Sequence, residues 1–173
     1  MRLDPNIQDN KNPLLKFAMH YGIFLGVFWA IKYLVFIAVD LWVHFIYFYY
    51  VLNVGTFLLI YIFYIRFVEL SNVKSKFQGF KFVILLCFFA SFFEAAIMYL
   101  HYQFLDPGYF AVKIEPTLIK MVDSLPYPPE MKAAALDFAS SKILYVFSAC
   151  MSNIFLGIFM GALMSFLVKK KDQ

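Results

Sequence analysis

The stretch ILYVFSACMSNIFLGIFMGALMSFLV, residues 143–168, contains neither a charged residue nor a proline. About 20 apolar residues in a helix cross the hydrocarbon core of a bilayer, so this stretch is long enough to span one. Three further stretches, residues 14–39, 42–68 and 80–105, are as long, nearly as apolar and free of proline. None alternates as the strands of a lipid-facing barrel do. The sequence therefore predicts an all-α fold, a transmembrane bundle of four helices.

The overall composition supports the same prediction. Hydrophobic residues make up 63% of the chain and charged residues 15%, whereas soluble domains are about half apolar and about a quarter charged. The excess apolar surface must face a solvent other than water, and the lipid bilayer is the simplest one. We expect residues 1–173 to form a single integral membrane domain, whose first helix is too long for a signal peptide and is retained.

The basic residues predict how the helices are oriented. A tight turn near Asp40 is expected to join the first two helices, and residues 66–81 form a basic connection between the second and third. The rule that lysine and arginine flank the cytoplasmic side predicts that both termini are cytoplasmic. That orientation gathers most of the basic residues on one side: Arg2, Lys11, Lys16, Arg66, Lys74, Lys76, Lys81, Lys169, Lys170 and Lys171.

The long segment 106–142 is predicted to be structured, although it holds most of the prolines. Pro116 suits a first helical turn. Leu118, Val122 and Leu125 then recur at helical spacing, so we expect a short amphipathic helix on the membrane surface. Residues 130–142 are expected to form a second helical piece that leads into the last span.

Small residues recur every fourth position in the first and last long helices, a pattern that lets helix backbones approach closely in lipid. We interpret it as packing of these two helices, either with each other or across a homo-oligomer. Asn153 and Asn53 are expected to form hydrogen bonds between helices. The predicted packing residues are Gly22, Gly26, Asn153, Gly157 and Gly161.

Lys32 and Glu94 are the charges expected deepest in the membrane, where each costs about 2.5–3.5 kcal/mol and usually pairs. They are expected at similar depth, so an ion pair is one interpretation; Lys32 can instead extend outward to the headgroups. The functional interpretation is a proton- or solute-linked site built on Glu94, and the structural one is an ion pair or polar plug. His101, seven residues after Glu94, lies on nearly the same helix face and either extends this site or is an interfacial hydrogen-bonding residue.

No motif of a known catalytic site occurs in the sequence. A glycine-rich phosphate loop, a His-Glu-x-x-His zinc motif, a Cys-x-x-Cys pair and a nucleophile elbow are all missing. The sequence therefore predicts no catalytic, cofactor-binding or metal site. The basic residues lie at the ends of the apolar stretches, where membrane topology explains them, so we expect no nucleic acid partner. We expect a non-enzymatic membrane subunit that anchors or organises a partner protein; the alternative is a small transporter or channel subunit using Glu94. A membrane enzyme acting on a lipid-linked substrate is the third interpretation.

Several features together resemble a bacterial inner-membrane family catalogued as domain of unknown function 4199. They are the glycines of the first helix (Gly22, Gly26), the segment YLHYQFLDP at residues 99–107, the proline-containing segment after it, and a last helix with Gly157 and Gly161 that closes in lysines. The resemblance implies four helices in an inner membrane and no assigned activity. It also suggests a glycosyltransferase of lipid-linked sugars as a partner, which no residue of this sequence indicates.

Overall fold

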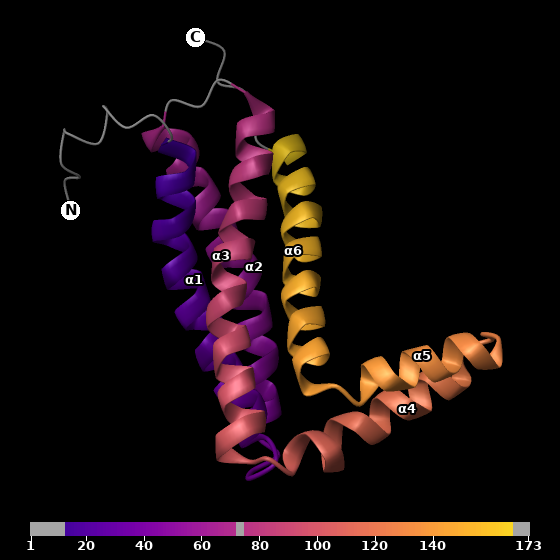
Figure 1. Ribbon diagram of the computed structural model, residues 1–173. Coiled ribbons are helices and arrows are strands. Elements are labelled where there is room, and N and C mark those ends of the chain that lie inside the picture. Colours follow the sequence, from indigo (N-terminus) through magenta and orange to yellow (C-terminus); the bar gives the residue numbers. More distant parts are fainter. Residues whose placement is uncertain (1–12, 72–74, 168–173) are drawn as a thin grey trace. The chain divides into compact units, whose positions relative to one another are not determined.

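The computed structural model describes residues 13–71 and 75–167, and within these ranges the chain is helical and contains no β-strand. The all-α prediction is confirmed. Figure 1 shows the helices in chain order, which are α1 (Pro13–Ala38), α2 (Phe45–Leu70), α3 (Lys76–Leu100), α4 (Glu115–Ser124), α5 (Pro129–Ala139) and α6 (Lys142–Leu167). Two π-helical turns, η2 (His101–Leu105) and η3 (Phe110–Ile114), lie between α3 and α4. Four helices, α1, α2, α3 with η2, and α6, are long and apolar enough to cross a membrane.

Two observed boundaries differ from the predicted ones by several residues. Helix α3 begins at Lys76, before the predicted start at residue 80, and α2 begins at Phe45, after the predicted start at residue 42. Lysine is a good helix former, so a helix continues past the point where an apolar run ends. Lys76 and Lys81 therefore lie on α3 and Arg66 lies on α2. Arg2, Lys11, Lys74 and the lysines at 169–171 fall outside the described residues.

The chain divides into two compact units. The described part of the first unit comprises α1, α2, α3 as far as Glu94, and α6 from Ser152 onward. The second unit comprises residues 95–151, which include η2, η3, α4 and α5.

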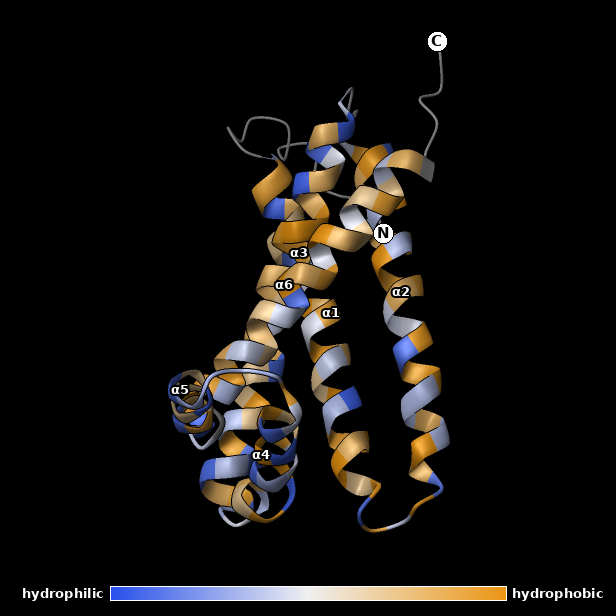
Figure 2. Ribbon diagram, turned by 90° about the vertical axis from the view of Figure 1, so that its right-hand side faces the viewer, coloured by the Kyte–Doolittle hydropathy of each residue, from blue (hydrophilic) through white to orange (hydrophobic). Residues whose placement is uncertain are grey.

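The first unit is a helical bundle with an aromatic core. Phe67 of α2 and Phe82 of α3 stack with their ring centroids 4.1 Å apart, and Leu25 and Trp29 of α1 are fully buried. Many large apolar side chains of these helices are exposed, and apolar residues predominate along all of these helices in Figure 2. An apolar core beneath an apolar exterior is the pattern expected of helices surrounded by hydrocarbon.

The second unit connects α3 to α6. After η2, the Asp106 carboxylate accepts hydrogen bonds from the backbone N–H groups of Gly108 (3.1 Å) and Tyr109 (3.0 Å), which turns the chain into η3. Helices α4 and α5 then lie side by side and form a hairpin (Figure 1). The predicted helical pieces are thus present, and α5 ends at Ala139, so Ser140 and Ser141 separate it from α6.

Candidate functional site: a polar cluster within the helix bundle

Glu94 and Asn153 form a direct contact between two of the long helices. The side-chain amide of Asn153, on α6, donates a hydrogen bond to the Glu94 carboxylate, on α3, at 2.7 Å. Both side chains are half-buried. Measured hydrogen bonds between helices in bilayers contribute about 0.6–2 kcal/mol each. Asn153 therefore has a partner between helices, as predicted, but the partner lies on α3 and not on α1.

Lys32 on α1 supplies the opposite charge. Its ammonium and the Glu94 carboxylate attract each other, but within the described part of the chain the two groups do not form a direct salt bridge. The helix register explains the gap. Gly26 of α1 faces Ala90 and Phe93 of α3. The residue of α1 at the same level as Glu94 is therefore near position 29. The backbone of Lys32 lies about one turn, roughly 5 Å, further along α1. The predicted similar depth of Lys32 and Glu94 thus holds only to within about one helical turn.

Trp29 completes the cluster and was missed in the sequence analysis. Its side chain is fully buried, and its indole N–H has no hydrogen-bond partner among the described residues. The Lys32 ammonium lies 5.6 Å from the centroid of its ring, within the range of a cation–π interaction. The available signal was the spacing: Trp29 precedes Lys32 by three residues, which puts both on neighbouring positions of one helix face.

The glycine ridges of α1 and α6 both face α3, which corrects the predicted pairing of the first and last helices. A Cβ atom at Gly22 would lie 2.7 Å from the Cβ of Phe89, and one at Gly157 would lie 2.9 Å from the Cβ of Cys87. Gly26 and Gly161 likewise approach α3, at Phe93 and Phe80. One helix thus receives both ridges, because α3 lies between α1 and α6 at these levels.

His101 lies in the second compact unit, whereas Glu94 lies in the first. The His101 side chain is buried, with its ring centroid 4.6 Å from that of Tyr109 and 5.3 Å from that of Tyr102. A path shared by Glu94 and His101 stays a prediction. Asn53, expected to bond between helices, instead donates to the backbone carbonyl of Tyr49 on its own helix at 2.9 Å.

The cluster can hold charge inside the bundle but offers few groups for covalent chemistry. Lys32, Glu94, Trp29 and Asn153 come from three helices, and the N–H donors among them outnumber the carboxylate acceptors. Within residues 13–71 and 75–167, no group of three His, Cys, Asp or Glu side chains is placed to hold a metal ion.

Long apolar helices around an internal polar cluster define the class: this is a helical membrane protein with a charged site inside its bundle. The chain belongs to the family described as "Protein of unknown function (DUF4199)", whose model matches residues 20–170. The family resemblance predicted from the sequence is thereby confirmed. No curated protein and no solved structure matches the chain.

Proposed function

We propose that this chain is a non-enzymatic, multi-pass subunit of a bacterial inner membrane that anchors or organises a partner protein, with both termini in the cytoplasm. The observation that carries the proposal is that Glu94, the one acidic residue of the third long apolar stretch, is engaged inside the bundle. Its carboxylate accepts the hydrogen bond from Asn153 and is attracted by Lys32.

This engagement favours a structural role for the cluster. A buried carboxylate with neither a donor nor a counter-charge is very costly in hydrocarbon, and the two partners offset that cost. The hydrogen bond also links α3 to α6. One oxygen of the carboxylate, Oε2, is already engaged by Asn153, which favours the structural role over the binding and release of a solute.

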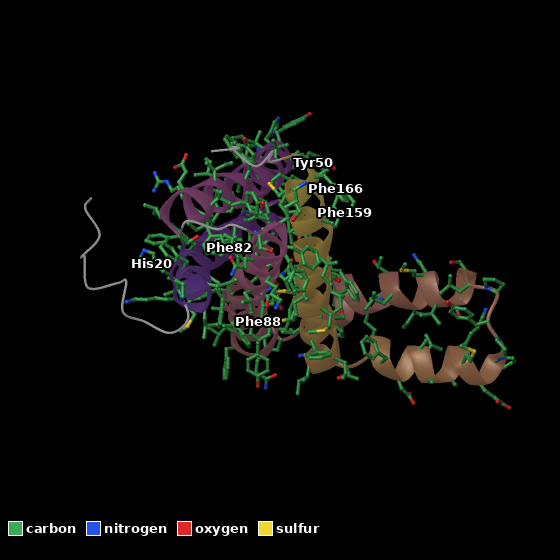
Figure 3. The ribbon with its side chains drawn as sticks, turned by 90° about the horizontal axis from the view of Figure 1, so that it is seen from above. His20, Tyr50, Phe82, Phe88, Phe159 and Phe166 are labelled. Atoms are coloured by element: carbon green, nitrogen blue, oxygen red, sulfur yellow. The ribbon has the colours of Figure 1, made fainter. Side chains whose placement is uncertain are left out.

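The outer face of α6 supports the partner role. Gly157 and Gly161 pack against α3, while Phe155, Phe159 and Phe166 point away from the bundle, the last two as labelled in Figure 3. Aromatic side chains supply large contact area with few rotatable bonds, which suits them to packing between proteins. This phenylalanine face is where we place the helix of a partner, which the family resemblance suggests is a glycosyltransferase of lipid-linked sugars, or a second copy of the chain.

Site-specific photo-crosslinking in native membranes tests the proposal. A photoreactive amino acid at Phe159, which is 66% exposed, is compared with one at Phe24 on α1, which is 55% exposed. We expect one recurrent protein adduct from position 159, lipid adducts alone from position 24, and co-purification of the same protein in mild detergent. Recovery of the chain alone under several mild detergents, with lipid adducts at both positions, would contradict the proposal.

A second candidate is a small transporter or channel subunit that works through Glu94. The observation that favours it is the buried indole N–H of Trp29, which has no acceptor among the described residues although it lies near the level of Glu94. A polar group of this kind is usually satisfied by water or a ligand. In proteoliposomes, Glu94→Gln should abolish proton or solute flux, and Glu69→Gln at the exposed end of α2 should not. Flux that is absent from the parent protein, or unchanged by Glu94→Gln, rules the candidate out.

A further inference from the structure

The segment between the last two long helices presents an apolar face that its own fold leaves uncovered. We call residues 110–139, which comprise η3, α4 and α5, the connecting hairpin. No residue of α4 is fully buried. Its apolar residues Leu118 and Val122, and Leu125 just after its end, are half-buried, as expected for the side that packs against α5.

Helix α5 carries the uncovered face. Met131 is 56% exposed and Phe138 is 44% exposed. With the exposed Ala134 they follow a three- and four-residue spacing, which places all three on one side of the helix. Glu130 and Asp137, also exposed and also seven residues apart, lie on an adjacent side. Met121 of α4, at 63% exposed, adds a further apolar side chain.

Both ends of the connecting hairpin are fixed to helices that are candidates to cross the membrane. Only Ser140 and Ser141 separate α5 from α6, so Ala139 and Lys142 are at most about 10 Å apart in extended chain. At the other end, the Lys142 ammonium, at the start of α6, donates hydrogen bonds to the backbone carbonyls of Tyr102 (3.1 Å) and Pro107 (3.0 Å). The base of the hairpin is therefore held where the long helices end.

An aromatic cluster reinforces this attachment. Phe110 of η3 packs against Tyr102 of η2 and Tyr145 of α6, with both pairs of ring centroids 5.6 Å apart. Phe110 and Tyr102 are almost fully buried. The hairpin thus begins from a packed joint at the level of the helix ends and is not a loosely attached loop.

From this attachment and the uncovered face we infer that the connecting hairpin lies in the membrane–water interface, with Met131, Ala134 and Phe138 inserted among the phospholipid chains. A helix with an apolar side and a charged side takes this position when it is held near a bilayer. Glu130 and Asp137 then remain on the water side. The inference does not depend on the proposed partner function.

The charges of the hairpin specify which lipids it should need. Residues 110–139 contain three lysines, Lys113, Lys120 and Lys132, against four carboxylates, Glu115, Asp123, Glu130 and Asp137. Lys132 is moreover engaged within the hairpin, where its ammonium donates to the backbone carbonyl of Asp123 at 2.8 Å. A segment without a basic excess gains little from anionic headgroups. Insertion should therefore be driven by apolar contact and should occur in zwitterionic phospholipid alone.

Spin labels placed one at a time test the inference in the full-length chain. The background carries Cys87→Ala and Cys150→Ser, because a thiol-reactive label could also attach to the two native cysteines, and single cysteines replace Met131, Phe138, Glu130 or Asp137. In phosphatidylcholine vesicles, we expect labels at 131 and 138 to collide with oxygen and to be shielded from a water-soluble nickel complex, at a depth of about 5–10 Å. Labels at 130 and 137 should show the reverse. Replacing part of the lipid by phosphatidylglycerol should leave both results unchanged.

Two results would overturn the inference. Equal exposure of all four labels to the nickel complex in vesicles would place the hairpin in water. Shielding of positions 131 and 138 in native membranes, but not in vesicles of pure lipid, would show that a protein covers this face. Because all four positions are exposed, the substitutions should leave folding intact, and the circular dichroism of each labelled variant checks this.

Discussion

Replacing Gly26 by alanine should destabilise the bundle, because Gly26 of α1 lies very close to α3. A Cβ atom there would lie 2.5 Å from Cδ2 and 2.8 Å from Cγ of Phe93, and 3.0 Å from the backbone carbonyl oxygen of Ala90. The Phe93 ring cannot swing clear easily, since Cγ is bonded directly to its own Cβ. The carbonyl oxygen belongs to the helix itself, so the two helices must separate.

The expected magnitude follows from two opposing effects. Overpacking a close contact costs about 1–3 kcal/mol, and alanine recovers up to about 1 kcal/mol over glycine within a helix. The net loss in the free energy of unfolding should be roughly 0.5–2 kcal/mol. Gly55→Ala on α2 is the matched control, because its Cβ would meet only the tip of the Phe28 ring, at 3.1 Å. That variant should be neutral or slightly more stable.

Reversible unfolding in mixed micelles, with increasing dodecyl sulfate, measures both variants. A double-mutant cycle with Phe93→Ala identifies the contact, since removing the ring should lower the cost of Gly26→Ala by about 0.5 kcal/mol or more. Part of the cost should remain, because the Ala90 carbonyl is unchanged. Equal stability of Gly26→Ala and the parent, or a cost that Phe93→Ala does not alter, would refute the packing of α1 on α3 described above.

Two further predictions concern the hydrogen bonds of the two units. Asn153→Leu should cost about 1–2 kcal/mol in the same unfolding assay, because it removes the donor to Glu94. The control Asn53→Leu removes only a bond within α2 and should cost clearly less. Equal costs would contradict the prediction. Lys142→Met should speed amide hydrogen exchange in residues 101–110, because the carbonyls of Tyr102 and Pro107 lose their donor. Exchange in α2 should stay the same. Unchanged exchange in residues 101–110 would show that Lys142 does not stabilise this segment.

The long helices could be predicted because hydrocarbon permits few alternatives. A backbone in lipid must satisfy its own hydrogen bonds, so an apolar run as long as residues 143–168 has to be helical. The ends were less predictable. Apolarity stops being informative at the first charge, and the extension of α3 back to Lys76 depends on helix propensity and not on hydropathy.

The positions of close helix contact were visible in the sequence, but the partner helix was not. Gly22 and Gly157 lack side chains, so they show where a backbone can approach but carry no information about what approaches. The surface that receives them on α3 includes Phe89 and Cys87, which are ordinary residues in an apolar run. Pairing of two ridges was inferred from their likeness, whereas packing requires complementary shapes, and a ridge of small residues fits a helix with larger ones.

The contact between Glu94 and Asn153 could have been predicted from depth alone. Glu94 lies 11 residues before the end of η2 at Leu105, and Asn153 lies 11 residues after the start of α6 at Lys142. At about 1.5 Å per residue, both fall roughly 16 Å from the ends that the second unit joins. The same counting places Lys32 only six residues, about 9 Å, from the end of α1 at Ala38. The Glu94 carboxylate therefore bonds to the Asn153 amide, which lies at the same depth. The Lys32 ammonium lies nearer the helix end and attracts the carboxylate without touching it.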